Sequence, residues 1–346
     1  MDAAPPSLRG SRVLVTGASG FTGGHLARAL LGTGARVRVF ARRAEAVAGL
    51  AADGAEAAIG DIRDARAVDA AVEGCEQVYH VAALYRDASG PEQAYWDVNV
   101  TGTEHVLASC ERHRVKRLLH CSTMGVHGSV SQVPSDETAP FKPGDAYQRS
   151  KLAGEEGVWA WFRRTGIPTA VIRPAGIYGP GDLRFLKLFR AIRGGWFVML
   201  GHGRTWYHQV YIDDLVRGFL LCGTRPEAVG EPFCISSGAP LRLNELVALV
   251  AEAVGVPAPR RRIPVWPVHA AAALCEAVCV PLGVNPPLHR RRVHFFINNR
   301  GWTSRKADRL LGYVSTVDHR DGLERTARWY EAQGLLAPPV NGKASR

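Results

Sequence analysis

Short apolar runs alternate, along the first half of the chain, with segments whose apolar residues recur at helical spacing. The apolar runs at 12–16, 36–40, 56–59, 77–81, 117–121 and 169–172 predict strands. Their nearly continuous apolar character is typical of parallel strands that are buried on both faces. The segments between them, such as 25–31, have the periodicity of amphipathic helices. This alternation predicts an α/β fold with a right-handed, doubly wound parallel sheet.

The pattern changes after residue 175. Helices are predicted at 185–194, 243–254, 267–280, 304–311 and 320–333, and segment 210–222 is expected to return to the sheet. We therefore expect a sheet lobe from 1–175 and 208–236, a smaller, discontinuous, mostly helical lobe from 176–207 and 237–336, and a flexible tail at 337–346. The smaller lobe should carry the substrate pocket, because ligands of such sheets bind outside the carboxyl ends of the strands.

One apolar segment of the smaller lobe has more than one interpretation. Residues 268–280 are rich in Ala, Leu and Val, but His269, Glu276 and Pro281 interrupt them. The segment is too short to span a bilayer. We interpret it as a buried helix of the smaller lobe. A cap over an apolar pocket and a helix in a membrane interface are the alternatives.

A glycine motif follows the first predicted strand. Gly17, Gly20 and Gly23 are spaced three apart, with Ser19, Phe21 and Thr22 between them, and a helical segment follows. Such a strand, turn and helix place unpaired backbone N–H groups and the positive end of a helix dipole against a phosphate. Glycines allow the close approach of the backbone. The motif in this context predicts a dinucleotide site.

A second motif places a phenol and an ammonium on one helix face. Tyr147 and Lys151 are separated by four positions, which is one helical turn. A nearby cation favours the phenolate, so we expect Lys151 to lower the pKa of Tyr147. Tyr147 would then exchange a proton with a substrate hydroxyl or ketone near neutral pH. Only the combination with the glycine motif gives this common spacing a functional meaning.

Charge and cysteine content limit the partners. The net charge is +11, and arginines gather at 260–262 and 290–292. We interpret them as solvated surface groups, because no nucleic-acid motif accompanies them; an anionic substrate or membrane surface would also suit such charge. The seven cysteines are scattered without a Cys-x-x-Cys pair, so we expect neither disulfides nor a metal site. With no apolar N-terminal signal, this predicts a cytoplasmic protein.

From about residue 12 to 336 the chain resembles the extended short-chain dehydrogenase/reductases, also called the NAD-dependent epimerase/dehydratase family. The matching stretches occur in the family's order and as a set are highly specific: 16–23 (TGASGFTG), 60–64 (GDIRD), 80–83 (HVAA), 99–103 (NVTGT), 121–128 (CSTMGVHG), 147–151 (YQRSK), 173–182 (RPAGIYGPGD) and 210–214 (VYIDD). The stretch 173–182 and the run from Val265 to Glu276 look like the 3β-hydroxysteroid dehydrogenase and dihydroflavonol-reductase branch.

The resemblance implies a Rossmann fold and a role for each matching residue. Thr123, Tyr147 and Lys151 would be the catalytic residues, with the Thr123 hydroxyl on the substrate oxygen and Lys151 also on the cofactor ribose. Asp61 and Ile62 would flank the adenine, Ala82 and Ala83 would line the cofactor cleft, and Asn99 would lie near the nicotinamide. The full set implied to bind the cofactor is Gly17, Ser19, Gly20, Phe21, Thr22, Gly23, Arg42, Asp61, Ile62, Val81, Ala82, Ala83, Asn99, Tyr147, Lys151, Pro174 and Ile177.

The second strand indicates which cofactor binds. An acidic residue at its end bonds the ribose 2′-hydroxyl of NAD, whereas an arginine accommodates the 2′-phosphate of NADP. Here the strand ends in Ala41, Arg42 and Arg43, with no carboxylate. We therefore favour NADP. NAD bound without an acidic anchor, with both arginines as loop charges, is the alternative.

Departures from the family pattern narrow the reaction. Met124 and Gly125 stand where the dehydratases and decarboxylases carry an acidic residue. Gly176 and Tyr207 replace an Asn and an Arg that nucleotide-sugar epimerases often show, although Arg204 or His208 could substitute for that arginine. We expect a dehydrogenase or ketoreductase acting on a secondary alcohol or ketone. The alternatives are a sugar epimerase without net redox change and an NADP-binding scaffold without chemistry.

The expected substrate pocket is mostly aromatic and apolar. Besides the catalytic residues it comprises Tyr85, Met124, Ala175, Phe185 and Tyr207, with few groups able to hold a diphosphate. The partners expected are thus a largely uncharged small-molecule substrate and, from the resemblance, a second copy of the chain in a homodimer.

Overall fold

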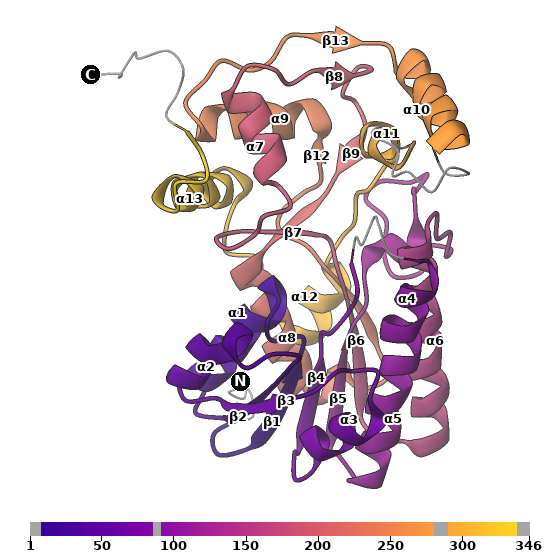
Figure 1. The fold of residues 1–346 in the computed structure, drawn as a ribbon, viewed down its shortest axis with the longest axis vertical. Helices are drawn as coiled ribbons and strands as arrows, with labels where there is room; N and C mark the ends of the chain where they lie inside the picture. The colour runs from indigo at the N-terminus through magenta and orange to yellow at the C-terminus, as the bar shows by residue number, and fades with distance from the viewer. Residues whose placement is uncertain (1–7, 86–90, 280–289, 338–346) are drawn as a thin grey trace.

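The computed structural model describes residues 8–85, 91–279 and 290–337, and its larger part is a seven-stranded parallel sheet covered by helices (Figure 1). The strand order is β11-β6-β5-β4-β1-β2-β3. The strands are β1 (Arg12–Thr16), β2 (Arg36–Ala41), β3 (Glu56–Ile59), β4 (Gln77–His80), β5 (Arg117–Cys121), β6 (Thr169–Pro174) and β11 (Pro232–Ile235). The predicted doubly wound parallel sheet is confirmed.

Alternating side chains of the five inner strands enter two separate apolar layers. In β1, Val13 and Val15 belong to one layer and Leu14 to the other. The layer around Leu14 is covered by α3 (Ala65–Val72), α5 (Gly102–Arg112) and α6 (Ala146–Thr165), which contact one another in that order. The opposite face is covered by α1 (Phe21–Gly32) and α8 (Ile212–Thr224). Burial on both faces explains why these strands are nearly continuous apolar runs in the sequence.

Shorter elements connect the strands. The helix α2 (Ala48–Ala52) follows β2, and a short 3-10 helix (Pro226–Ala228) follows α8. The helix α4 (Gln93–Trp96) continues through a π-helical turn (Asp97–Thr101) into α5. This turn packs against α6. The helix that leaves β4 therefore supports the helix that carries Tyr147 and Lys151.

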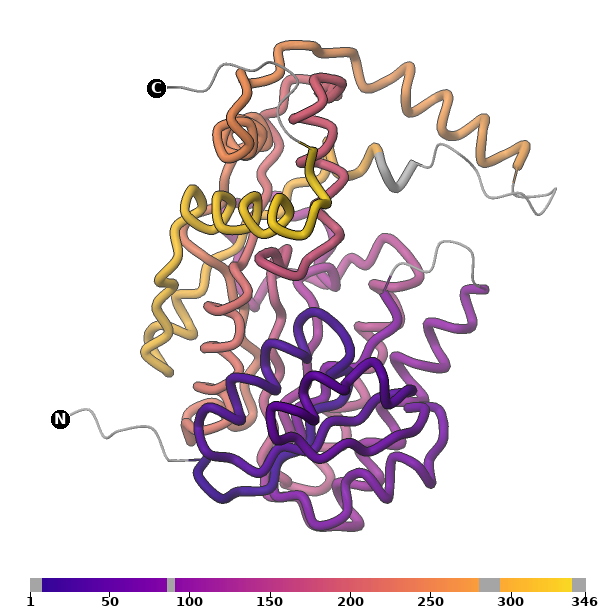
Figure 2. The backbone as a smooth tube through the Cα atoms, turned by 60° about the vertical axis from the view of Figure 1, so that its left-hand side comes forward, coloured from indigo at the N-terminus to yellow at the C-terminus, as the bar shows by residue number. Residues whose placement is uncertain are grey.

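The smaller lobe lies beyond the carboxyl ends of the strands (Figures 1 and 2). Its helices are α7 (Leu186–Arg193), α9 (Leu243–Ala253), α10 (Val265–Cys279), α11 (Arg290–Ile297) and α13 (His319–Ala332). Three short strand pairs join them: β7 (Gly176–Tyr178) with β10 (Gln209–Tyr211), β9 (Trp206–Tyr207) with β12 (Leu241–Arg242), and β8 (Met199–Leu200) with β13 (Arg262–Ile263). The helix α12 (Arg305–Leu311) falls in the range expected for this lobe, but it contacts β11 and α8 at the sheet.

Two expectations about particular segments have a different outcome. The expected burial of the helix at 267–280 is wrong: of the α10 residues only Ala272 is buried. The expected tail at 337–346 lies, apart from Ala337, outside the described residues. No helix among the described residues is long and apolar enough to cross a membrane.

Candidate active site

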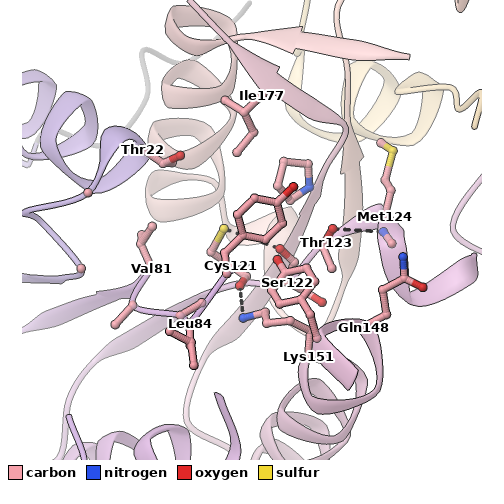
Figure 3. Close-up of a pocket in the computed structure, with 18 of the residues that line it drawn as sticks. Thr22, Val81, Leu84, Cys121, Ser122, Thr123, Met124, Gln148, Lys151 and Ile177 are labelled. Carbon is pink, nitrogen blue, oxygen red and sulfur yellow. Dashed lines mark hydrogen bonds between the residues drawn. The ribbon is translucent and has the colours of Figure 1, made fainter. Parts of the chain in front are cut away.

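A cavity of about 1080 Å³ opens at the carboxyl ends of the sheet strands. Its walls come from the turn after β1, the ends of β2, β4, β5 and β6, the start of α6 and the smaller lobe. It brings together every predicted site residue except Asn99 and Phe185, which lie outside its lining. Residues far apart in the sequence thus form one site (Figure 3).

The backbone packs so closely at the glycine turn that a side chain would not fit at Gly17 or Gly23. Gly17 has a φ of +72°, and a Cβ there would lie 2.7 Å from the backbone nitrogen of Ala82. A Cβ on Gly23 would lie 2.2 Å from the carbonyl oxygen of Gly17. The helix α1 then begins at Phe21 with Gly20 as its N-cap and without a capping side chain. This cradle fits a dinucleotide pyrophosphate, because the helix N-terminus is left for an anion.

Basic groups line the cavity next to the place where β2 ends. Arg42 and Arg63 both line it there, next to Asp61 and Ile62. Arg63 donates to both carboxylate oxygens of Asp61, at 3.0 and 2.7 Å. These bonds hold the pKa of Asp61 at about 2. Asp61 is therefore ionised at neutral pH and accepts hydrogen bonds only.

A buried hydrogen-bond network fixes the loop after β4, which lies directly beside the glycine turn. The Thr16 hydroxyl accepts from the backbone N–H groups of Val81 and Ala82, both at 3.1 Å, and is 2.8 Å from His80 Nδ1. Because that hydroxyl accepts twice, it donates its proton to His80 Nδ1. His80 Nε2 then donates to the Thr103 hydroxyl at 3.0 Å.

Asn99 supports the site from behind its wall. Its Oδ1 accepts from the backbone N–H of Leu84 at 2.8 Å, and its Nδ2 donates to the Ser150 hydroxyl at 2.9 Å. Its side chain is buried and ties the loop after β4 to α6. Asn99 thus positions the loop after β4 and α6, and its side chain does not line the cavity.

Lys151 lies fully buried on α6 and points to the end of β5. Its ammonium donates to the carbonyl oxygen of Cys121 at 2.7 Å (Figure 3). Burial lowers the pKa of Lys151, while Cys121 and Glu155 oppose that shift. One helical turn further on, Glu155 forms a buried ion pair with Arg173, whose Nε lies 3.1 Å from Glu155 Oε1. These contacts hold α6 against β5 and β6.

Tyr147 stands at the start of the same helix. Asp145 caps α6 by accepting from the backbone N–H of Gln148 at 2.8 Å. The Tyr147 ring packs edge-on against Tyr85, with ring centres 4.8 Å apart. Burial raises the pKa of Tyr147, so the expected lowering by Lys151 is wrong for this structure. The physical reason is that the Lys151 ammonium lies on the Cys121 carbonyl, while the Tyr85 ring packs against the partly exposed Tyr147 ring.

Thr123 ends the segment that leaves β5 and lines the cavity together with Tyr147. Its Oγ1 accepts from the backbone N–H of Gly125 at 3.0 Å, which fixes the side chain (Figure 3). The hydroxyl proton therefore remains available to donate to a substrate oxygen. Thr123, Tyr147 and Lys151 together provide two O–H donors and one buried ammonium in one cavity.

Most of the predicted aromatic and apolar residues line the substrate end of the cavity. Tyr85, Met124, Ala175 and Tyr207 line the cavity. Phe185 instead packs behind Tyr207, with ring centres 6.2 Å apart. The lining thus keeps most of the predicted apolar side chains.

Cations make this end less apolar than expected. Arg184 and Arg300 line the cavity, and so does Lys142. Arg184 is held by the buried Asp182 at 2.6 Å, with its guanidinium 5.7 Å from the centre of the Tyr85 ring. Although burial alone would lower it, Asp182 holds the pKa of Arg184 above its usual value. The expectation that few groups could hold an anion is therefore wrong.

Neither residue proposed as a substitute for the missing epimerase arginine takes that place. Arg204 is exposed and lies outside the lining. His208 does line the cavity, but its Nε2 lies 3.1 Å from the Ser237 carbonyl and its Nδ1 accepts from the Trp302 N–H. Arg300, which sequence reasoning missed, is one of the cations that line the cavity. Arg300 follows α11, a helix that the sequence analysis did not predict.

Comparisons with known proteins find related sequences and folds. The model of the NAD dependent epimerase/dehydratase family matches residues 13–236. The sterol demethylase protein B of Methylococcus capsulatus is 32% identical, over 93% of this chain and 99% of that protein. A 4-hydroxy-2-methyl-3-oxo-4-farnesyl-3,4-dihydroquinoline-1-oxide ketoreductase of Stigmatella aurantiaca is 32% identical, over 90% of this chain and 95% of that protein.

A third relative and a solved structure extend the comparison. A 3 beta-hydroxysteroid dehydrogenase/Delta 5-->4-isomerase of Mycobacterium tuberculosis is 34% identical, over 73% of this chain and 72% of that protein. The crystal structure of gox2253 superposes with a TM-score of 0.81 at 26% identity, covering 94% of this chain and 100% of that one. The predicted likeness to the 3β-hydroxysteroid dehydrogenase branch is confirmed by such relatives.

Proposed function

Because the chain belongs to the NAD-dependent epimerase/dehydratase family, we propose that it is an oxidoreductase that transfers a hydride between NAD(P) and a secondary alcohol or ketone. The observation that carries the proposal is that Thr123, Tyr147 and Lys151 share one cavity with the glycine cradle. The sequence of the chain supplies both motifs, and the fold brings them to the same edge of the sheet.

The protein's own residues explain the proton chemistry. The glycine cradle would hold the pyrophosphate of the cofactor, and the nicotinamide would supply or accept the hydride. In the reducing direction the substrate carbonyl carbon gains that hydride, and its oxygen takes the phenolic proton of Tyr147. Thr123 donates a hydrogen bond to the same oxygen, and Lys151 holds a positive charge in the same cavity. A phenol is protonated at neutral pH, so Tyr147 can donate its proton in the reducing direction.

The substrate proposed is an apolar molecule that carries a hydroxyl or keto group. Tyr85, Met124 and Tyr207 offer apolar walls, and burying apolar surface there contributes about 25 cal/mol per Å². Relatives with sterol, hydroxysteroid and farnesyl compounds in their names favour the same class. Arg184, beside Tyr85, would bind a second oxygen of the substrate.

A nucleotide-sugar epimerase is the second candidate, and Arg300 favours it. Diphosphates are held by arginines in bidentate reach, and Arg300 and Lys142 both line the cavity. An epimerase returns the hydride to its substrate, so the cofactor shows no net change. This candidate competes with the oxidoreductase on the same residues.

Net cofactor turnover distinguishes the two functions. The purified protein would be incubated with reduced NADP or NAD and a panel of apolar ketones, while the absorbance of the reduced nicotinamide is followed. Stoichiometric oxidation of the cofactor supports the oxidoreductase. Interconversion of nucleotide sugars without that change supports the epimerase, and Arg300→Ala should then weaken nucleotide-sugar binding by about one to two decades. Under the oxidoreductase proposal the same variant leaves ketone turnover nearly unchanged.

We propose NADP as the preferred cofactor. The side of the cavity next to β2 carries Arg42 and Arg63, and no carboxylate follows the strand at Ala41. An arginine at this place accommodates a 2′-phosphate. A cytoplasmic location and a homodimer complete the proposal. All seven cysteines are free of disulfides, which supports the cytoplasmic location. The family resemblance supports the homodimer.

A further inference from the structure

The helix α10 exposes a continuous apolar face, which we call the α10 stripe. Its members share one side of the helix, at intervals of three or four residues or side by side: Trp266, Pro267, Ala270, Ala271, Leu274, Ala277 and Val278. Trp266 is 74% exposed, Leu274 67% and Val278 53%. The exposed side of a helix in a globular protein is normally polar. A single exposed apolar residue needs no explanation, but a contiguous apolar face indicates an interaction surface.

The charges around the α10 stripe indicate what it binds. Arg260, Arg261 and Arg262 are exposed directly before the helix, and Arg262 is held to the carbonyl of His202. From 256 to 279 the single acidic residue is Glu276, which is not part of the stripe. An apolar face bordered by arginines is complementary to the headgroup layer of an anionic bilayer. A second copy of the chain would instead bring its own arginine cluster to the same surface.

The dimensions of the helix agree with a position in the plane of a membrane. Fifteen residues form a helix of about 22 Å, shorter than the ~30 Å hydrocarbon core, so α10 would lie along the surface. Trp266 near its first turn is the residue type that collects at membrane interfaces. In Figures 1 and 2 the helix lies at the edge of the smaller lobe, on the side remote from the sheet.

We propose that the α10 stripe is an interfacial membrane contact, and that it holds the substrate end of the cavity against an anionic bilayer. The helix α10 packs on α11, and His294 and Phe295 of α11 line the cavity. Substrates dissolved in the membrane would therefore enter next to the contact. Only this second statement rests on the proposed function; the membrane contact itself stands on the α10 stripe and its arginines.

Vesicle flotation of the full chain, without cofactor or substrate, tests the membrane contact. We expect the parent protein to float with vesicles containing about one third phosphatidylglycerol and to bind pure phosphatidylcholine about tenfold more weakly. Trp266→Ser with Leu274→Ser should reduce binding to the anionic vesicles at least about tenfold. The matched control is Ile59→Ser with Val314→Ser, which removes two other exposed apolar side chains and should leave binding unchanged.

A second pair of variants tests the charge. Arg260→Glu with Arg261→Glu should remove the preference for anionic vesicles, whereas Arg36→Glu with Arg163→Glu, the same change of net charge on other exposed arginines, should retain it. Retained binding in both the stripe and the arginine variants would overturn the proposal, as would a parent protein that stays in the aqueous phase.

Light scattering covers the remaining alternative. If the parent self-associates in solution and the Trp266/Leu274 variant does not, the α10 stripe is a contact between copies and the proposal fails. Ketone turnover is measured separately with water-soluble substrates. If the parent protein turns over no ketone but still binds vesicles, the proposed function is wrong and the membrane contact is supported.

Discussion

At the scale of single residues, the phenol of Tyr147 decides whether the site transfers protons. Tyr147→Phe keeps the ring that packs on Tyr85 but removes the proton donor. We expect turnover to fall by about 10²–10⁴ while cofactor binding persists, as is typical when a general acid is removed. Steady-state rates together with cofactor titration check both parts.

Tyr95→Phe is the matched control for this variant. The Tyr95 ring is buried 6.4 Å from the Tyr147 ring, but Tyr95 is not part of the cavity lining. Removing the Tyr95 hydroxyl should leave the turnover rate within a few-fold of the parent rate. A near-normal rate for Tyr147→Phe would show that another group supplies the proton.

Two neighbouring arginines test the preference for NADP. Arg42 lines the cavity, whereas Arg43 is exposed outside it. A charge-assisted contact contributes roughly 1.5–3 kcal/mol, so Arg42→Ala should weaken NADP binding by about one to two decades and affect NAD far less. Arg43→Ala should change neither. Calorimetric titration with both cofactors measures this, and equal losses for NADP and NAD would make Arg42 a simple loop charge.

The site residues that could be predicted from the sequence are those that belong to a short local motif. Gly17, Gly20, Gly23 and the Tyr147/Lys151 pair occur at short, characteristic spacings, and the structure places all of them on one cavity. The roles that depend on long-range packing could not be read in this way. Arg184 reaches the cavity because Asp182 holds it, and the pKa of Tyr147 depends on protein that surrounds it from other segments.

At the scale of elements, the position of α6 depends on the absence of a side chain at Gly154. A Cβ there would lie 2.4 Å from the carbonyl oxygen of Asn99, in the π-helical turn before α5. Gly154→Ala should therefore push α6 away from that turn, lower the free energy of unfolding by about 1–3 kcal/mol and reduce turnover, because α6 carries Tyr147 and Lys151. Denaturant unfolding and rate measurements check the two effects.

Gly157 provides the control within the same helix. Nothing lies within 4 Å of a Cβ built there, so Gly157→Ala should raise the free energy of unfolding by about 0.5–1 kcal/mol through helix propensity alone. Turnover should stay unchanged. If both substitutions act alike, the close approach of α6 to Asn99 does not control the site.

The elements that were predicted and those that were missed differ in how they are stabilised. The strands β1 to β6 are apolar runs of four to six residues, so their pattern alone identified them. The pairs formed by β7, β8, β9, β10, β12 and β13 are only two or three residues long, and each pairs with a segment distant in sequence. The missed strand β11 begins with Pro232 and lies at the edge of the sheet, where a proline is tolerated.

At the scale of the whole molecule, two lobes share one apolar core. The layer that contains Val13 and Val15 of β1 continues to Leu246 and Val250 of α9. Tyr330 of α13 also donates from its hydroxyl to the carbonyl of Asp182 at 2.6 Å, beside the arginine that enters the cavity. The site is therefore coupled to the stability of the whole chain, which makes global unfolding a relevant measurement.

Buried neutral histidines should make that stability sensitive to acid. Burial lowers the pKa of His80 to about 3 and those of His127 and His208 to about 4, and it lowers the pKa of His120 well below its usual value. Positive neighbours add to this effect: Lys151 beside His80 and His120, and Arg173 beside His127. All four histidines are buried inside the protein.

The direction of the pH dependence follows from these lowered values. Below the ordinary histidine pKa of about 6.5 the unfolded chain binds protons that the folded chain does not. The free energy of unfolding is therefore highest above that pH and falls as the pH drops toward the folded values. Each histidine contributes a slope of up to about 1.4 kcal/mol per pH unit. Urea unfolding between about pH 8 and 5 should show a steep loss.

Replacing one of these histidines separates its contribution from the rest. Neither ring nitrogen of His120 has a hydrogen-bond partner among the described residues, so His120→Leu removes a titrating group without removing a bond. We expect its slope below pH 6.5 to be smaller than that of the parent by about 1.4 kcal/mol per pH unit. His202→Leu, at an exposed histidine, should keep the parent slope. An unchanged slope for His120→Leu would mean that His120 takes up no additional proton on unfolding. The acid sensitivity would then have to arise from His80, His127 and His208.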